Sequence, residues 1–228
     1  MDELRIGDFV SVGNDKFEPV YSFGHYDPAS LGTFLQIETV NTALQVSIDH
    51  MVFVQGKGPI PSSNILIGDM LQGRLGQEHE VVSIKHIVSK GLFAPFTPSG
   101  TIVVNNIVAS SFVAFEGASS LRVVGVDVSY QWLAHSFEFP HRVVCYYAGN
   151  CPMEAYDENG VSVWNAIPLR LAQALLEQSS VVRTLLLVST VMVLVFFYLT
   201  ELLITRPVVF ASICLGHWAI RRRGTKRP

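Results

Sequence analysis

The sequence predicts an all-β fold of two pseudo-symmetric β-subdomains, followed by a small mixed extension and a C-terminal transmembrane helix. Three observations support this prediction: short apolar runs between turn residues, an internal repeat, and one long uncharged stretch near the C-terminus. We expect a β domain at 1–117, an extension with a hairpin and a helix at 118–180, the membrane helix at 181–205, and a short apolar segment with a basic tail at 206–228.

Residues 1–117 are rich in Val, Ile, Leu, Phe and Thr, and Gly, Pro, Asn, Asp and Ser punctuate these apolar runs. Such runs are typical of short strands joined by turns, and no stretch in this region follows the 3.6-residue period of a helix. The expected strands include 34–39, 44–48, 50–54, 81–88 and 101–109.

Four segments of the β region recur in the same order. The pairs are 4–10 with 65–71, 20–25 with 81–86, 32–36 with 100–104, and 44–47 with 108–111. Generic strand and turn composition is one interpretation, but the shared order favours two homologous subdomains related by a pseudo-two-fold. Each half contains Ile-Gly-Asp, which predicts a turn before a strand, because Gly tolerates positive φ and Asp bonds nearby backbone N–H groups.

The extension mixes element types. Residues 131–144 are rich in Trp, Phe and His, and Asp157-Glu158-Asn159-Gly160 predicts a hairpin turn between 153–156 and 161–164. A helix is expected over 168–178 with Pro168 in its first turn. Its apolar side would carry Leu169, Ala172, Leu175 and Leu176.

The long uncharged stretch, 184–200, has 17 residues, and its apolar flanks extend it to the roughly 20 that a membrane span needs. A buried core helix is the alternative. The run 207–220 is short for a span and could be an interfacial helix or the second arm of a hairpin. Five of the 16 basic residues lie in 221–228, which predicts a cytoplasmic tail and a lumenal or extracellular β domain on a single-pass protein.

Charge and composition restrict the partners. The net charge is −3, and only 15% of residues are charged. With the basic tail set aside the chain is acidic, which argues against nucleic acid as a partner.

No signal peptide is expected at the start of the sequence, because 1–10 carries charges where an apolar core would be needed. Since a lumenal domain needs such a signal, we expect the natural protein to be longer at its N-terminus.

Two short motifs could carry chemistry. Ser47 and His50 flank a tight turn, where a hydroxyl could orient a carbonyl and a neutral imidazole could give a proton to a departing amine. A structural histidine is the alternative there. His25 and Asp27 lie two residues apart and could form an acid–base pair or only stabilise a turn.

Other sites have little support in the sequence. His79 and His86 lack neighbouring ligands at metal spacing, and no phosphate-binding or dinucleotide motif occurs, so we expect no metal and no cofactor. Cys145 and Cys151 could form a disulfide in a lumenal domain or remain two buried thiols.

The ordered motifs resemble the Hint superfamily, specifically its Hog branch, the hedgehog C-terminal autoprocessing domain. The matching segments are LRIGDFV, YSFGHYDP, FLQIET, LQVSIDHMVFV, APFTPSGTIVVNNIVASSFVAF and LAHSF. The resemblance covers about 1–140 and implies two pseudo-symmetric β-subdomains. It also implies intein-like self-proteolysis, in which a cysteine at the start of the module attacks the preceding carbonyl and a sterol or another nucleophile then resolves the thioester.

The family's Thr-x-x-His falls on Ser47 and His50, so the resemblance implies that His50 protonates the leaving amine while Ser47 positions it. The family's sterol-activating acid falls on His25, and its later cysteine falls on Ser111. The nucleophilic cysteine is expected some fifteen to twenty residues before Leu4 and is absent from the printed chain. The chain is therefore predicted to be inactive alone. The alternative function is a membrane-anchored, non-catalytic β-rich binding module.

Overall fold

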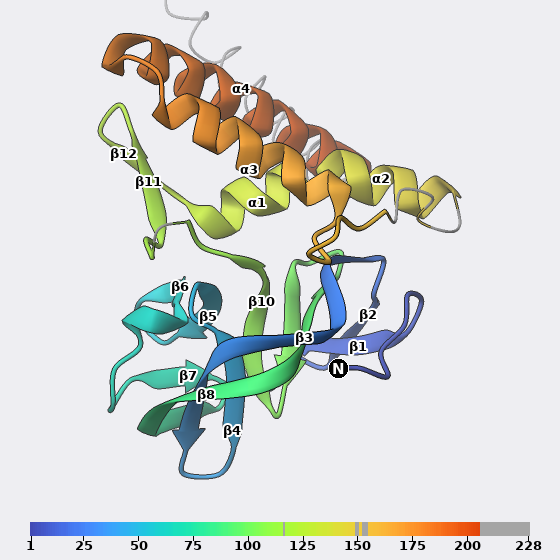
Figure 1. The fold of residues 1–228 in the computed structure, drawn as a ribbon, viewed down its shortest axis with the longest axis vertical. Helices are drawn as coiled ribbons and strands as arrows, with labels where there is room; N and C mark the ends of the chain where they lie inside the picture. Colours follow the sequence, from blue (N-terminus) through green and yellow to red (C-terminus); the bar gives the residue numbers. More distant parts are fainter. Residues whose placement is uncertain (116, 149–150, 152–154, 206–228) are drawn as a thin grey trace, which may run out of the picture.

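The computed structural model describes residues 1–115, 117–148, 151 and 155–205, which form a β-rich body below a layer of helices (Figure 1). The strands are β1 (Phe9–Gly13), β2 (Lys16–Pro19), β3 (Ser22–Thr39), β4 (Ala43–Ser47), β5 (His50–Val54), β6 (Gly58–Pro61), β7 (Met70–Gln72), β8 (Glu78–Phe96), β9 (Thr101–Val104), β10 (Ile107–Val113), β11 (Ser120–Val123) and β12 (Val126–Ser129). The predicted all-β class of the body is confirmed.

The main sheet has the strand order β4-β3-β8-β7-β5-β10-β9, with β6 pairing on β5. Its two longest strands, β3 and β8, pair antiparallel from Ser22↔Phe96 to Thr39↔Val81, with register shifts at three places. Such bulges bend a strand and increase its twist, so this pair curves around the body and joins the first half of the chain to the second. Two small hairpins, β1–β2 and β11–β12, lie outside the main sheet.

The two Ile-Gly-Asp turns have the same hydrogen bonds. Asp8 accepts from the Arg5 N–H at 2.7 Å and Asp69 from the Leu66 N–H at 3.0 Å. The amide of Gly7 donates to Val20 and that of Gly68 donates to Val81, both at 2.8 Å, and both glycines have φ of 92°. This equivalence at an offset of 61 residues supports the predicted duplication.

The predicted strands match the structure except in one place. The runs 34–39, 44–48, 50–54 and 81–88 fall on β3, β4, β5 and β8, with one residue of 44–48 in the following turn. The single strand expected over 101–109 is wrong, because β9 and β10 form a hairpin there. Asn105 and Asn106 have φ of 47° and 68°, the left-handed conformation that asparagine tolerates and a two-residue hairpin turn requires.

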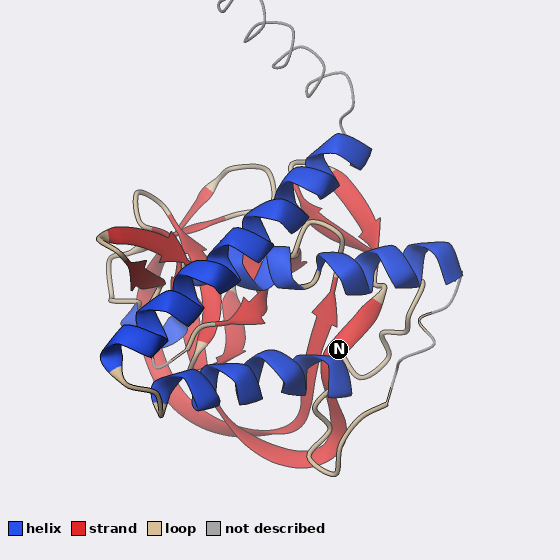
Figure 2. Cartoon of the chain, turned by 90° about the horizontal axis from the view of Figure 1, so that it is seen from above, coloured by secondary structure: helices blue, strands red, loops and turns tan. Residues whose placement is uncertain are grey.

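Four helices form the upper layer: α1 (Tyr130–Phe137), α2 (Phe139–Ala148), α3 (Val163–Leu176) and α4 (Ser180–Thr205). Figure 2 shows this layer from above, lying across the strands. Helix α1 begins at a capping residue, Ser129, whose hydroxyl accepts from the Trp132 N–H at 3.2 Å.

Helix α3 corrects the predicted start at Pro168. It begins five residues earlier, so Pro168 lies inside the helix rather than in its first turn.

The predicted turn at 157–160 is present, with Gly160 N–H donating to the Asp157 carbonyl at 2.9 Å. Because Val163 already starts the helix, the second arm of that hairpin is shorter than expected. The side chain of Leu175 is half-buried, whereas those of Leu169, Ala172 and Leu176, and residues 153–154, lie outside the described residues.

The apolar helix predicted over 181–205 is confirmed as α4, and it is the one helix in the described part of the chain that is long and apolar enough to cross a membrane. An ion pair fixes its inner face, because Arg142 Nη2 on α2 lies 2.7 Å and 2.8 Å from the two carboxylate oxygens of Glu201. The apolar run 207–220, Cys214 and the basic tail lie outside the described residues.

Candidate active site

The turn between β4 and β5 positions both residues of the Ser-x-x-His motif. Ser47 ends β4, Ile48 and Asp49 form the turn, and His50 begins β5. The buried hydroxyl of Ser62 donates to the carbonyls of Ser47 and Ile48 at 2.7 Å and 2.8 Å. From the other side the Ala114 N–H donates to the Asp49 carbonyl at 2.7 Å. These bonds from Ser62 and Ala114 fix the backbone of the turn, which restricts the orientation of the His50 side chain.

The His50 ring is directed toward β10. Its Nε2 lies 2.7 Å from the carbonyl oxygen of Ser110. Since a carbonyl only accepts hydrogen bonds, Nε2 carries the proton. In the neutral ring Nδ1 then holds the free lone pair, and it is the nitrogen that can take up and release a proton.

The surroundings keep this imidazole neutral. Burial lowers the pKa of His50 below its ordinary value of 6.5, and the opposing bond from the Ser110 carbonyl does not restore it. Near pH 7 the ring can accept a proton and, once protonated, is a stronger acid than an exposed histidine. Both properties suit a group that carries a proton from a nucleophile to a leaving group.

The carbonyl that holds His50 is itself held by a buried network. The Ser110 hydroxyl donates to Gln131 Oε1 on α1 and accepts from the Phe112 N–H at 2.8 Å. Gln131 Nε2 donates to the Gly100 carbonyl at 3.1 Å, and Gly100 also accepts from the Ser111 N–H at 2.9 Å. The first helix of the extension thus supports the strand that clamps the histidine.

Two serines near this clamp have hydroxyls without a hydrogen-bond partner in the part of the chain that the structure describes. Ser47 is half-buried at the end of β4, opposite Phe34 in the β3–β4 register, and its carbonyl rather than its hydroxyl is engaged by Ser62. Ser111 is 2% exposed, and its hydroxyl finds no partner among the described residues. A buried hydroxyl without a partner is unfavourable by itself, so Ser111 lies where a further polar group would be accommodated.

His25 lies in a different setting, on β3 beside the extension. Its Nε2 donates to the Asn159 carbonyl at 2.8 Å, and its backbone forms a bridge with Val161. The neighbouring Tyr26 N–H donates to the Gly160 carbonyl at 2.8 Å. These bonds attach the turn at 157–160 to the β body.

Asp27 stabilises a turn. Its carboxylate accepts from the N–H groups of Ala29 and Ser30 at 2.9 Å and 3.0 Å, and from the Ser30 hydroxyl. These bonds, led by the Ser30 hydroxyl, lower the pKa of Asp27. Since the carboxylate is occupied at a bulge of β3, the structure favours the turn-stabilising alternative over an acid–base pair with His25.

Three residues that support His50 were not predictable from the sequence. Ser62, Ser110 and Gln131 come from a 3-10 turn, β10 and α1, and all act through hydrogen bonds to backbone or to one another. Isolated serines and a glutamine carry no local pattern, so no signal in the sequence placed Ser110 beside the Ser47 turn.

Comparison with known proteins shows which family and which relatives this chain resembles. A family model described as the Hint module matches residues 1–177. Warthog protein 4 of Caenorhabditis elegans is 26% identical over 134 residues, covering 48% of this chain and 24% of that protein. Tiggy-winkle hedgehog protein of Danio rerio is 29% identical over 131 residues, covering 50% and 32%. Protein hedgehog of Drosophila melanogaster is 30% identical over 135 residues, covering 52% and 28%.

The chain thus spans a quarter to a third of the length of these relatives. Among solved structures, the gp41-1 intein aligns with a TM-score of 0.41 at 17% identity, covering 47% of this chain and 83% of the intein. The match to the Hint module and the hedgehog relatives define the class of this protein as an autoprocessing-type module. The chain belongs to the Hint family.

Proposed function

We propose that this chain cleaves its own polypeptide, with the segment joined upstream as substrate. The observation that carries the proposal is the His50 imidazole, held at Nε2 by the Ser110 carbonyl at 2.7 Å and kept neutral by burial. Since Nε2 is committed to the Ser110 carbonyl, Nδ1 is the ring nitrogen left for proton transfer. Membership of the Hint family supports the same conclusion.

The proposed first step is an N-to-S acyl shift. A cysteine thiol preceding the module attacks the carbonyl carbon of the residue before it, so that a C–S bond forms and the C–N bond breaks. His50 Nδ1 takes the thiol proton and delivers it to the departing amine nitrogen, which leaves a thioester and a free amine. The hydroxyl of Ser47 would donate to the carbonyl oxygen as negative charge develops on it.

The described cysteines are a poor source of this nucleophile, because Cys145 and Cys151 are joined in a disulfide. Inactivity of residues 1–228 on their own remains a prediction. Catalytic roles for His25 and Asp27 also remain predictions, and the bonds of both residues give them structural roles first.

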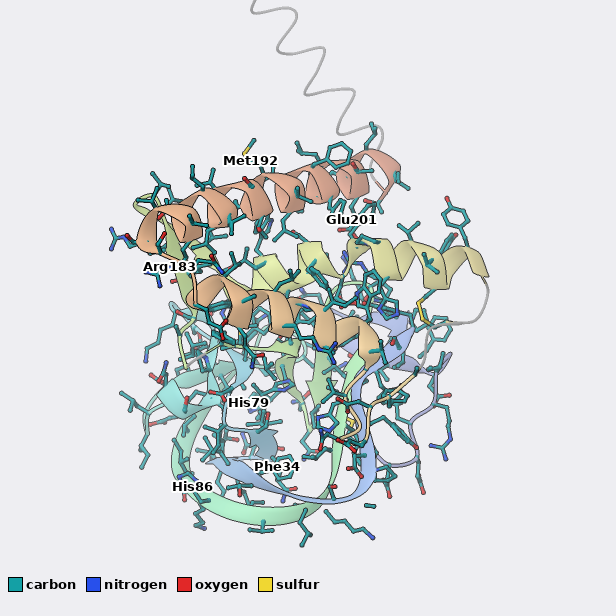
Figure 3. The ribbon with its side chains drawn as sticks, turned by 45° about the horizontal axis from the view of Figure 1, so that its top comes forward. Phe34, His79, His86, Arg183, Met192 and Glu201 are labelled. Carbon is teal, nitrogen blue, oxygen red and sulfur yellow. A yellow bond between two sulfur atoms is a disulfide. The ribbon has the colours of Figure 1, made fainter. Side chains whose placement is uncertain are left out.

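The test uses the whole protein encoded by the gene, with tags at both ends. Wild type should divide into two fragments on incubation, and dithiothreitol should accelerate the division by attacking the thioester. His50→Ala should stay intact, and His86→Ala, which changes an exposed histidine on β8, should divide normally (Figure 3). A wild-type protein that is folded but stays intact would contradict the proposal and would favour a binding module.

The same experiment identifies the acceptor of the thioester. Mass spectrometry of the N-terminal fragment distinguishes a free carboxylate, produced by water, from a sterol ester formed when a sterol is supplied in detergent. The position expected to activate a sterol carries His25, whose Nε2 is already committed to the Asn159 carbonyl. We therefore propose water or a thiol as acceptor unless a sterol mass is found.

Membrane attachment is the second part of the proposal, and α4 carries it. Leu185, Met192 and Phe196 lie on its outer face and are 63–64% exposed, while Leu194 on the inner face is 6% exposed. Figure 3 shows Met192 directed away from the β body. An exposed apolar stripe on a packed helix suits contact with lipid.

Vesicle flotation tests this attachment. Wild type should float with phospholipid vesicles, and the double variant Met192→Glu, Phe196→Glu should float less. Val88→Glu, at an equally exposed apolar position on β8, is the control and should float like wild type. Alkaline carbonate then separates a helix that crosses the bilayer, which stays with the vesicles, from one that lies on the surface. The lumenal orientation and cytoplasmic tail remain predictions.

A further inference from the structure

A second cluster of reactive side chains lies under the helical layer, on the extension and separate from His50. His141 and Glu138 are each 2% exposed, and Cys145, one turn further along α2, is 7% exposed. Cys151 follows the helix and is joined to Cys145 in a disulfide. The ligand atoms of His141, Cys145 and Cys151 all lie within 4.8 Å of one another.

The orientation of His141 is fixed on both sides of its ring. Nδ1 lies 2.9 Å from Glu138 Oε2, and Nε2 lies 3.1 Å from Cys151 Sγ. The Tyr21 hydroxyl donates to the same Glu138 oxygen at 3.2 Å. The ring also stacks on Trp164, with centroids 5.1 Å apart and planes 29° apart. The Glu138 carboxylate therefore fixes the position of Nδ1, and Nε2 points at the sulfur of Cys151.

A disulfide alone does not require this arrangement. Because Nδ1 donates to the Glu138 carboxylate, Nε2 of the neutral ring carries a lone pair. A disulfide sulfur has no hydrogen to donate to that lone pair, so a buried Nε2 aimed at it is poorly satisfied. A metal-binding histidine, in contrast, almost always donates its other ring N–H to a carboxylate, which orients the ring and raises its basicity. His141 and Glu138 have that relationship.

We propose that, once the disulfide is reduced, His141 Nε2 and the sulfurs of Cys145 and Cys151 bind a zinc ion, with water as the fourth ligand. Two thiolates and an imidazole are a typical zinc donor set. Tetrahedral ligands at zinc bond lengths lie about 3.5–3.8 Å from one another, close to the separation of His141 Nε2 and Cys151 Sγ. Two thiolates also neutralise the dication, so the buried site gains no net charge.

The redox step balances with a dithiol as reductant. The dithiol gives two electrons and two protons to the disulfide, which yields two thiols on the protein and one cyclic disulfide. Zinc then displaces the two thiol protons to solvent. The site consequently exists in two exclusive states, a disulfide and a metal complex, and the thiol–disulfide balance of the compartment selects between them.

Cobalt is the probe, because Co²⁺ bound to thiolates absorbs in the near ultraviolet and gives visible bands when it is tetrahedral. The full chain with Cys214→Ser is reduced with dithiothreitol, freed of the reductant without oxygen, and titrated. We expect one Co²⁺ per chain, displaced by Zn²⁺, and no binding by the oxidised chain. His141→Ala and Cys145→Ser should each weaken binding at least tenfold, Glu138→Gln about ten- to a hundredfold, and His86→Ala not at all.

Reduction of the disulfide could unfold the extension and so prevent Co²⁺ binding. Circular dichroism, which measures helix content, detects such unfolding. Helix content lost on reduction and restored by Zn²⁺ would support the site. Unchanged Co²⁺ spectra in His141→Ala, or a reduced chain that binds no Co²⁺ and is not refolded by Zn²⁺, would overturn it and leave a structural disulfide. Neither outcome depends on self-cleavage, so the site stands or fails independently of the proposed function.

Discussion

The two halves of the β body share a scaffold and differ in chemistry. Their Ile-Gly-Asp turns match bond for bond at an offset of 61 residues. At the candidate site the match between 44–47 and 108–111, extended by three residues, makes Ala114 the counterpart of His50 in the second half. The first half supplies the imidazole, and the second supplies the Ser110 carbonyl that clamps it.

This difference shows what duplication provides in such a fold. Two copies of one unit can pair along β3 and β8 and bury a common core, which needs sequence similarity only at turns and apolar positions. The two copies then contribute different residues to the junction between them. One copy can contribute the reactive side chain, and the other can contribute the groups that hold that side chain in place. Substitutions at equivalent positions of the two halves, or at the site between them, test this asymmetry.

The largest effect is expected at the site. His50→Ala removes the proposed proton carrier. General acid–base groups typically contribute about 10²–10⁴-fold to rate, so self-cleavage of the whole protein should slow by that factor. Cleavage rates are followed by gel densitometry, with circular dichroism showing that the variant is folded. An unslowed rate would remove His50 from the mechanism.

The core should respond unequally to truncation in the two halves. Leu71 is fully buried, whereas its counterpart Val10 is half-buried. Leu71→Ala should reduce the free energy of unfolding by about 2–5 kcal/mol and Val10→Ala by about 1 kcal/mol. Urea denaturation measures both, and equal losses would show that the first half is packed as tightly as the second.

The paired glycines should respond equally. Gly7 and Gly68 both have φ of 92°, and a Cβ at either position would meet nothing within 4 Å, so only backbone strain is added. Each Gly→Ala change should reduce stability by roughly 1–2 kcal/mol. Values that differ by more than about 1 kcal/mol would show that the two turns are not equivalent in solution.

The paired aspartates should differ slightly. Both accept a backbone N–H, but Asp69 also accepts from Lys57 Nζ at 2.6 Å. Burial alone would raise the pKa of Asp69, yet the Lys57 and Leu66 bonds lower it. Asp8→Ala should reduce stability by about 1 kcal/mol, and Asp69→Ala by up to about 1 kcal/mol more. High salt should reduce the difference; a difference unchanged by salt would argue against the ion pair.

The smallest effect is a dependence of stability on pH. Because the pKa of folded His50 lies below 6.5, the unfolded chain takes up a proton first as pH falls, and stability decreases from about pH 6.5 down to the folded pKa. His135, whose pKa is lowered by burial and by Arg142, adds a second decrease of the same sign. Urea midpoints between pH 7.5 and 5 should show a shallower slope for His50→Gln than for wild type; an identical slope would mean that His50 is not desolvated.

The fold was largely predictable, because turns and apolar alternation are local and the repeat is visible as matched segments. One error was local and one was not. The pair Asn105-Asn106 between two apolar runs is a hairpin-turn signal, which the single strand expected over 101–109 overlooked. Pro168 inside α3, in contrast, contradicts its usual place in a first turn. The extension contained helices at 130–148 whose aromatic residues hid any clear period.

The site was predictable only in part. Ser47 and His50 are adjacent in sequence and match a motif, so they could be found, whereas Ser62, Ser110 and Gln131 reach the turn only through the folded chain. The cluster at His141 had a usable signal, His-x3-Cys-x5-Cys with an acidic residue three positions before the histidine. That spacing differs from common zinc motifs, and the contact between His141 and Cys151 depends on where the chain goes after α2.

Proton transfer at this site would depend on one ring, a neutral imidazole at position 50 with its proton on Nε2 and a lone pair on Nδ1. Long-range ¹H–¹⁵N correlation spectra of histidine-labelled protein, assigned with His50→Gln, report both the tautomer and its titration. We expect the Nε2–H tautomer and a midpoint below pH 6.5. An Nδ1–H tautomer, or a midpoint above that of a free histidine, would contradict the clamp by Ser110 and the proton transfer inferred from it.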